Sequence, residues 1–65
     1  MRVKLGNRVY LCTTATHNEG SVLIMLTIGN QVYTVNMLSA KKALECHENL
    51  LIDGYYDFSN YEYCC

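Results

Sequence analysis

The chain has 65 residues, of which 51% are hydrophobic and none is proline, and its formal net charge at pH 7 is −1. This length allows one domain, residues 1–65, and the hydrophobic content argues against a disordered chain. The weakly negative net charge excludes a strongly basic protein that would coat nucleic acid.

Two Gly-Asn pairs, Gly6-Asn7 and Gly29-Asn30, separate strand-forming runs. Glycine accepts the positive φ that two-residue turns need, so the sequence predicts two β-hairpins. Because side chains alternate along a strand, the register of each hairpin defines an inward face that is mostly apolar. The predicted inward residues are Val3, Leu5, Tyr10 and Cys12 in the first hairpin and Val22, Ile24, Leu26, Tyr33, Val35 and Met37 in the second.

A helix is predicted from about Ala40 to Asp53, with Ser39 as its N-cap and Gly54 at its end. The expected apolar face of this helix consists of Ala40, Ala43, Leu44, His47, Leu50 and Leu51. The fold class is therefore α+β, with a small four-stranded antiparallel sheet built from the two hairpins and one helix packed on it. The aromatic C-terminal segment should lie extended along the domain, where it could add a fifth strand.

The four cysteines and two histidines raise the question of a metal ion. No export segment is visible, so a reducing cytoplasm is expected, where cysteines are free or metal-bound more often than paired. The absence of a CxxC pair excludes a zinc ribbon or finger of ordinary spacing, but zinc held by separate elements is predicted to stabilise this small core. The predicted ligands are Cys12, Cys46, His47, Cys64 and Cys65.

Three alternatives to zinc stay open. Cys12 and Cys46 could be small apolar core residues, and His47 could be a core histidine bonded to a carbonyl. Disulfides are the third alternative. His17 lies in a loop, where we expect it to be solvated.

The tail mixes aromatic and acidic side chains in a pattern typical of protein–protein interfaces. The predicted partner-binding residues are Tyr55, Tyr56, Asp57, Tyr61 and Glu62. The alternative is that these tyrosines complete the core.

Enzymatic activity is not expected, because the chain has no P-loop, no GxGxxG and no Ser/His/Asp order. Cys46 and His47 are adjacent on the predicted helix and point about 100° apart, so they do not face each other for proton transfer. The alternative function is a small nucleic-acid-binding regulatory protein. Its candidate contacts would be the basic residues Arg2, Lys4, Arg8, Lys41 and Lys42.

Residues Val22 to Tyr63 resemble the small phage-encoded anti-CRISPR proteins that inhibit type II-A effector nucleases. The shared features are an apolar strand, a Gly-Asn hairpin leading into residues 31–35, a helix from Ser39 and an acidic, tyrosine-bearing end. The resemblance implies a non-catalytic inhibitor that binds the CRISPR effector nuclease in the bacterial cytoplasm and blocks target-DNA loading. It implies contact with the protein surface of the nuclease, with no direct nucleic-acid or membrane contact. The oligomeric state stays open.

Overall fold

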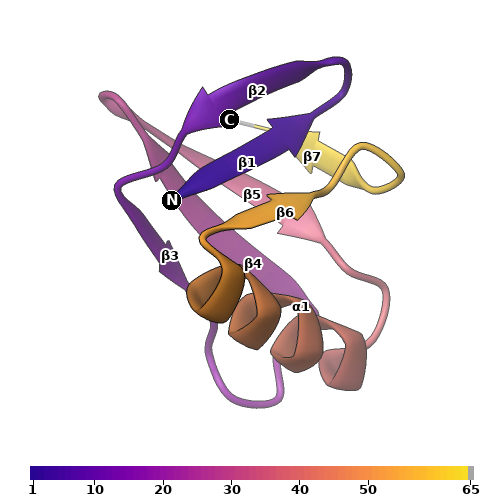
Figure 1. Cartoon of the computed structure of the whole chain (residues 1–65). Coiled ribbons are helices and arrows are strands. Elements are labelled where there is room, and N and C mark those ends of the chain that lie inside the picture. The colour runs from indigo at the N-terminus through magenta and orange to yellow at the C-terminus, as the bar shows by residue number, and fades with distance from the viewer. Residues whose placement is uncertain (65) are drawn as a thin grey trace.

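The computed structural model describes residues 1–64, which form one helix and seven strands. In chain order these are β1 (Arg2–Leu5), β2 (Arg8–Leu11), β3 (Thr14–Thr16), β4 (Leu23–Ile28), β5 (Gln31–Asn36), α1 (Ala40–Asp53), β6 (Tyr55–Asp57) and β7 (Glu62–Cys64). The strands form a three-stranded sheet in the order β2-β1-β6 and a four-stranded sheet in the order β3-β4-β5-β7. Figure 1 shows the first sheet lying over the second, with α1 along one side of the pair.

Both predicted hairpins are confirmed, together with their registers. Gly6 has φ 63° and Gly29 has φ 61°, the left-handed region that these two-residue turns require. In the first hairpin Val3 pairs with Tyr10. In the second hairpin Leu26 pairs with Tyr33, as the alternation of apolar side chains predicts.

The prediction that the two hairpins share one sheet is wrong. The β1-β2 hairpin pairs with β6 in parallel, and the β4-β5 hairpin pairs with β3 and β7 to form the antiparallel sheet of four strands. The backbone changes sheets directly after β2. The amide of Cys12 donates to the carbonyl of Met1 (2.8 Å), in the first sheet. The next amide, of Thr13, donates to Thr27 in the second sheet (2.9 Å).

The helix has the predicted bounds because both ends are capped. The Ser39 hydroxyl accepts a hydrogen bond from the amide of Lys42 at 3.0 Å, which satisfies one of the free donors of the first turn. At the other end Gly54 adopts φ 71°, and its amide donates to the carbonyl of Leu50 at 2.8 Å.

The buried face of α1 differs from the predicted one. Ala43, Cys46 and Leu50 are buried, whereas Leu44 is 50% and Leu51 is 53% exposed. The helix packs against β6 of one sheet and against β3 and β4 of the other, so it spans the seam between the sheets. Packing into a seam buries a narrower stripe than packing onto a broad sheet, and the flanking leucines stay in solvent.

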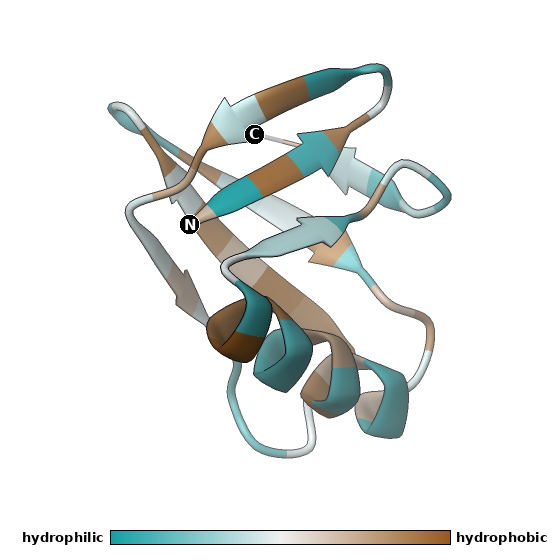
Figure 2. Cartoon of the chain, in the orientation of Figure 1, coloured by the Kyte–Doolittle hydropathy of each residue, from teal (hydrophilic) through white to brown (hydrophobic). Residues whose placement is uncertain are grey.

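The core lies between the sheets and α1. Nearly all predicted inward residues contribute to it, and Figure 2 shows the strongly hydrophobic course of β4 through its centre. Val22 is an exception, since it precedes β4 and is exposed. The buried residues are Val3, Leu5, Cys12, Ile24, Leu26, Val35, Met37, Ala43, Cys46, Leu50 and Phe58.

Candidate functional site

The side of the three-stranded sheet that faces away from the core combines apolar and charged side chains. The register aligns them in two rows across the strands, Leu11–Arg2–Tyr55 and Val9–Lys4–Asp57. We call this surface the outer sheet face, defined by Arg2, Lys4, Val9, Leu11, Tyr55 and Asp57.

Large apolar side chains on the outer sheet face are well exposed. Leu11 is 70%, Val9 is 53% and Tyr55 is 42% exposed. Single exposed apolar residues are normal on protein surfaces. These three, however, lie together on one small sheet face, at outward-facing positions where polar residues would fit equally well. The arrangement is typical of a protein-binding surface, in which aromatic and arginine side chains are enriched.

The charges of the outer sheet face are partly balanced. Asp57 is aligned with Lys4, and its carboxylate Oδ1 accepts a hydrogen bond from the Ser59 amide at 2.8 Å. Hydrogen bonds from Ser59, assisted by the charge of Lys4, hold the pKa of Asp57 below its usual value. Asp57 therefore stays a carboxylate beside Lys4, and the face carries both signs of charge.

The predicted tail surface is divided between the core and two different sheets. Tyr56 and Tyr61 are partly buried and pack against the core, as the alternative interpretation of the tail expects. Tyr55 and Asp57 are exposed on the outer sheet face. Glu62 is exposed on β7 of the four-stranded sheet. The five predicted partner-binding residues therefore do not form one continuous surface.

The predicted zinc ligands also have separate surroundings. The buried Cys12 thiol donates to the Thr14 carbonyl at 3.1 Å, and burial raises the pKa of that thiol. Cys64 is exposed on β7, and Cys65 lies outside the described residues. Residues 1–64 contain no group of three or more His, Cys, Asp or Glu side chains placed to hold a metal ion. Zinc binding by the predicted set stays a prediction.

Cys46 and His47 have the reverse of their expected places on α1. Cys46, which is not a member of the predicted apolar face, is fully buried, whereas His47, which is a member, is only partly buried. The Nε2 atom of His47 lies 3.0 Å from the Ala15 carbonyl oxygen, the bond expected of a core histidine. The Cys46 thiol donates to the Tyr56 hydroxyl oxygen at 3.0 Å.

Tyr56, a tail residue that packs against the core, has a hydroxyl group whose pKa is shifted by its surroundings. The hydrogen bond with Cys46 raises the pKa of the Tyr56 hydroxyl, and burial raises it further. The folded state therefore keeps the tyrosine proton to a higher pH than the unfolded chain does.

We expect alkaline pH to destabilise the fold in part through Tyr56. An unfolded tyrosine ionises near pH 10, and an unfolded cysteine near pH 8.5, whereas both Tyr56 and Cys12 hold their protons to higher pH when folded. The unfolded state therefore binds fewer protons, and the stability present below these values is lost as pH rises. Each group contributes at most about 1.4 kcal/mol per pH unit, and Tyr56 contributes less because it is only partly buried.

Urea unfolding between pH 7 and pH 11 measures this loss. The Tyr56→Phe variant should lose less stability over the range than the wild type, and the exposed matched control Tyr55→Phe should lose as much as the wild type. Equal losses in all three proteins would contradict the role of Tyr56.

Part of the outer sheet face could have been found from the sequence. The predicted register of the first hairpin already places Lys4 and Val9 opposite the core-facing side, and alternation extends that face to Arg2 and Leu11. The contribution of Tyr55 and Asp57 could not be predicted, because it depends on the parallel pairing of β6 with β1, for which the sequence carries no local signal.

Comparisons of the chain with models of known protein families, with curated proteins and with solved structures found no significant match. Among residues 1–64, no helix is long and apolar enough to cross a membrane. The outer sheet face and the chemistry of individual side chains are therefore the basis for a functional proposal.

Proposed function

We propose that the chain is a non-catalytic protein that acts by binding another protein through its outer sheet face. The observation that carries the proposal is the row Leu11–Arg2–Tyr55, in which two exposed apolar side chains flank an arginine. Tyrosine and arginine are the residue types that most often dominate binding energy at protein interfaces. The alignment of Lys4 with Asp57 in the next row would give the surface a fixed polarity toward its partner.

The position of the face in the fold supports this proposal. Both outer strands, β2 and β6, are edges of the three-stranded sheet. Strand edges leave backbone groups unpaired by the sheet, and they can pair with an extended segment of a partner. A rigid sheet also presents its side chains without a large ordering cost on binding.

The proposed partner is a type II-A CRISPR effector nuclease, whose loading with target DNA the protein would block. The resemblance of residues 22–63 to anti-CRISPR proteins suggests this partner, and the outer sheet face is the surface that we propose for the contact. Neither the four-stranded sheet nor the tail offers a continuous acidic surface in the described residues, since Asp57 and Glu62 lie on different sheets. We therefore favour contact with a protein surface of the nuclease over imitation of DNA.

The test is co-elution with a type II-A nuclease and inhibition of its target cleavage. The double variant Leu11→Ser with Tyr55→Ala should bind at least about 30-fold more weakly than the wild type, because each residue is an expected binding hot spot. The matched control is Met25→Ala with Val32→Ser, which changes two exposed residues on the four-stranded sheet and should leave binding unchanged. Circular dichroism checks that every variant is folded.

Two outcomes would contradict the proposal. If the wild type neither co-elutes with the nuclease nor inhibits it, the proposed partner is wrong. If the control variant loses binding and the outer-face variant keeps it, the proposed surface is wrong. Tight binding to free DNA that weakens steeply with salt would instead support the nucleic-acid-binding alternative.

A further inference from the structure

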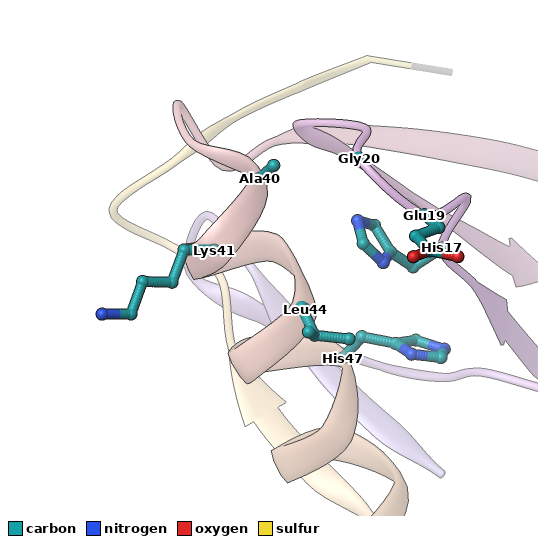
Figure 3. Close-up of a pocket in the computed structure, with 7 residues that line it drawn as sticks. All are labelled: His17, Glu19, Gly20, Ala40, Lys41, Leu44 and His47. Atoms are coloured by element: carbon teal, nitrogen blue, oxygen red, sulfur yellow. The ribbon is translucent and has the colours of Figure 1, made fainter.

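The two histidines of the chain lie together, although 30 positions separate them in the sequence. His17 follows β3 in the loop that leads to β4, and His47 lies on α1. Their ring centres are 6.0 Å apart with an angle of 42° between the ring planes. Figure 3 shows both rings at one cavity, with His17 and Glu19 on the loop and His47 on the helix.

Both imidazoles have the same protonation pattern. Nε2 of His17 lies 2.7 Å from the Ser21 carbonyl oxygen, and Nε2 of His47 lies 3.0 Å from that of Ala15. A carbonyl oxygen can only accept, so each Nε2 carries the proton and donates it. The lone pair of each neutral ring is therefore on Nδ1. Metal-binding histidines are held in this way, with the non-coordinating nitrogen donating to a carbonyl or carboxylate.

The ring separation is close to that of two imidazoles that share one ion. Two imidazoles that coordinate one zinc ion tetrahedrally through bonds of about 2.0–2.1 Å have ring centres about 5 Å apart, so His17 on its loop would move about 1 Å toward His47 to share the ion. The cavity has a volume of about 640 Å³, which leaves room for an ion and its water ligands. Glu19 lines the same cavity, and Lys41 points away from the histidines in Figure 3. The ammonium group of Lys41 therefore does not oppose a cation at the rings.

We propose that His17 and His47 form a two-histidine site for a divalent transition-metal ion, bound through the two Nδ1 atoms. Water would complete the coordination, since residues 1–64 place no third His, Cys, Asp or Glu side chain with the two rings to hold a metal ion. Imidazole ligands favour zinc, nickel or copper over magnesium or calcium. The bound ion would fasten the 17–22 loop to α1. This site shares His47 with the zinc site expected from the sequence but uses none of its cysteines, and it does not depend on the proposed binding function.

The test is titration of the untagged, reduced and chelator-treated full chain with zinc, followed by calorimetry and by the NMR signals of the histidine rings. One equivalent should bind, the signals of both rings should shift together, and magnesium should shift neither. His17→Ala and His47→Gln should each weaken binding about tenfold or more, since even loss of a supporting partner costs 10- to 100-fold. Glutamine at position 47 retains a donor for the Ala15 carbonyl and limits any effect on folding.

The matched control is the double variant Cys64→Ser with Cys65→Ser, which should bind zinc as the wild type does. Binding that survives both histidine variants but disappears in the cysteine variant would overturn the proposal and assign the ion to the cysteines. Ring signals that stay unchanged in the presence of excess zinc would also overturn it, because the histidines would then serve only to bind their two carbonyl groups.

Discussion

Replacing Phe58 with alanine should destabilise the protein by about 3–5 kcal/mol, which is most of the stability available to a domain of this size. Phe58 is the largest fully buried side chain, and its ring lies 4.8 Å from that of Tyr56. Its amide also donates to the Lys4 carbonyl at 2.8 Å, directly after the paired residues of β6. Phe58 therefore holds the aromatic tail against the three-stranded sheet. A cavity at this position would remove packing contacts from the tail and from the sheet.

Denaturant unfolding of Phe58→Ala and Phe58→Leu measures this effect. The leucine variant keeps most of the apolar volume and should lose less than about 1.5 kcal/mol. The control Tyr55→Ala changes a neighbouring exposed aromatic residue and should have a small effect, within about 1 kcal/mol of the wild type. A Phe58→Ala protein as stable as this control would show that the tail is not part of the core.

Replacing Gly29 with valine should destabilise the protein by about 1–2 kcal/mol, because an L-residue at positive φ brings its Cβ too close to the backbone. Gly29 has φ 61°, and apart from Gly29 and its two chain neighbours no atom lies within 4 Å of the position that a Cβ would occupy. The cost therefore comes from the backbone conformation alone and not from a collision with a neighbour. The turn joins β4 to β5, the longest strands of the fold, so strain in the substituted turn would weaken the pairing of two strands that contribute to the core.

The comparison of Gly29→Val with Gly29→Asn isolates this cause. Asparagine tolerates positive φ better than valine does, so its cost should be clearly smaller. Thermal unfolding of both variants provides the measurement. Equal melting temperatures for Gly29→Val and the wild type would be incompatible with the tight turn.

Local features of the fold were predictable from the sequence, whereas long-range pairing was not. The Gly-Asn turns, the Ser39 cap and the Gly54 end depend on a few adjacent residues, and all were predicted correctly. The change of sheet after Cys12 depends on hydrogen bonds to Met1 and to residues far along the chain, and no local pattern encodes it. The single sheet was therefore wrong even though both hairpins were correct.

The buried face of α1 differs from the predicted one because the helix contacts β6, a contact that was not predicted. Ala43, Leu44, Leu50 and Leu51 have a spacing that suits one broad apolar face, yet only Ala43 and Leu50 are buried. The tail packs beside α1 as β6, and the buried Cys46 of the helix faces Tyr56, with which it forms a hydrogen bond. The same pairing of the tail completes the outer sheet face by placing Tyr55 beside Arg2, so the part of this candidate site that β6 contributes could not be predicted from the sequence.

Site-specific photo-crosslinking to a type II-A nuclease tests the central claim most directly, because it reports which surface touches the partner. A photoreactive residue at Leu11, on the outer sheet face, should crosslink to the nuclease, and one at Val32, which is also exposed but on the four-stranded sheet, should not. Crosslinking from position 32 without crosslinking from position 11 would contradict binding through the outer sheet face.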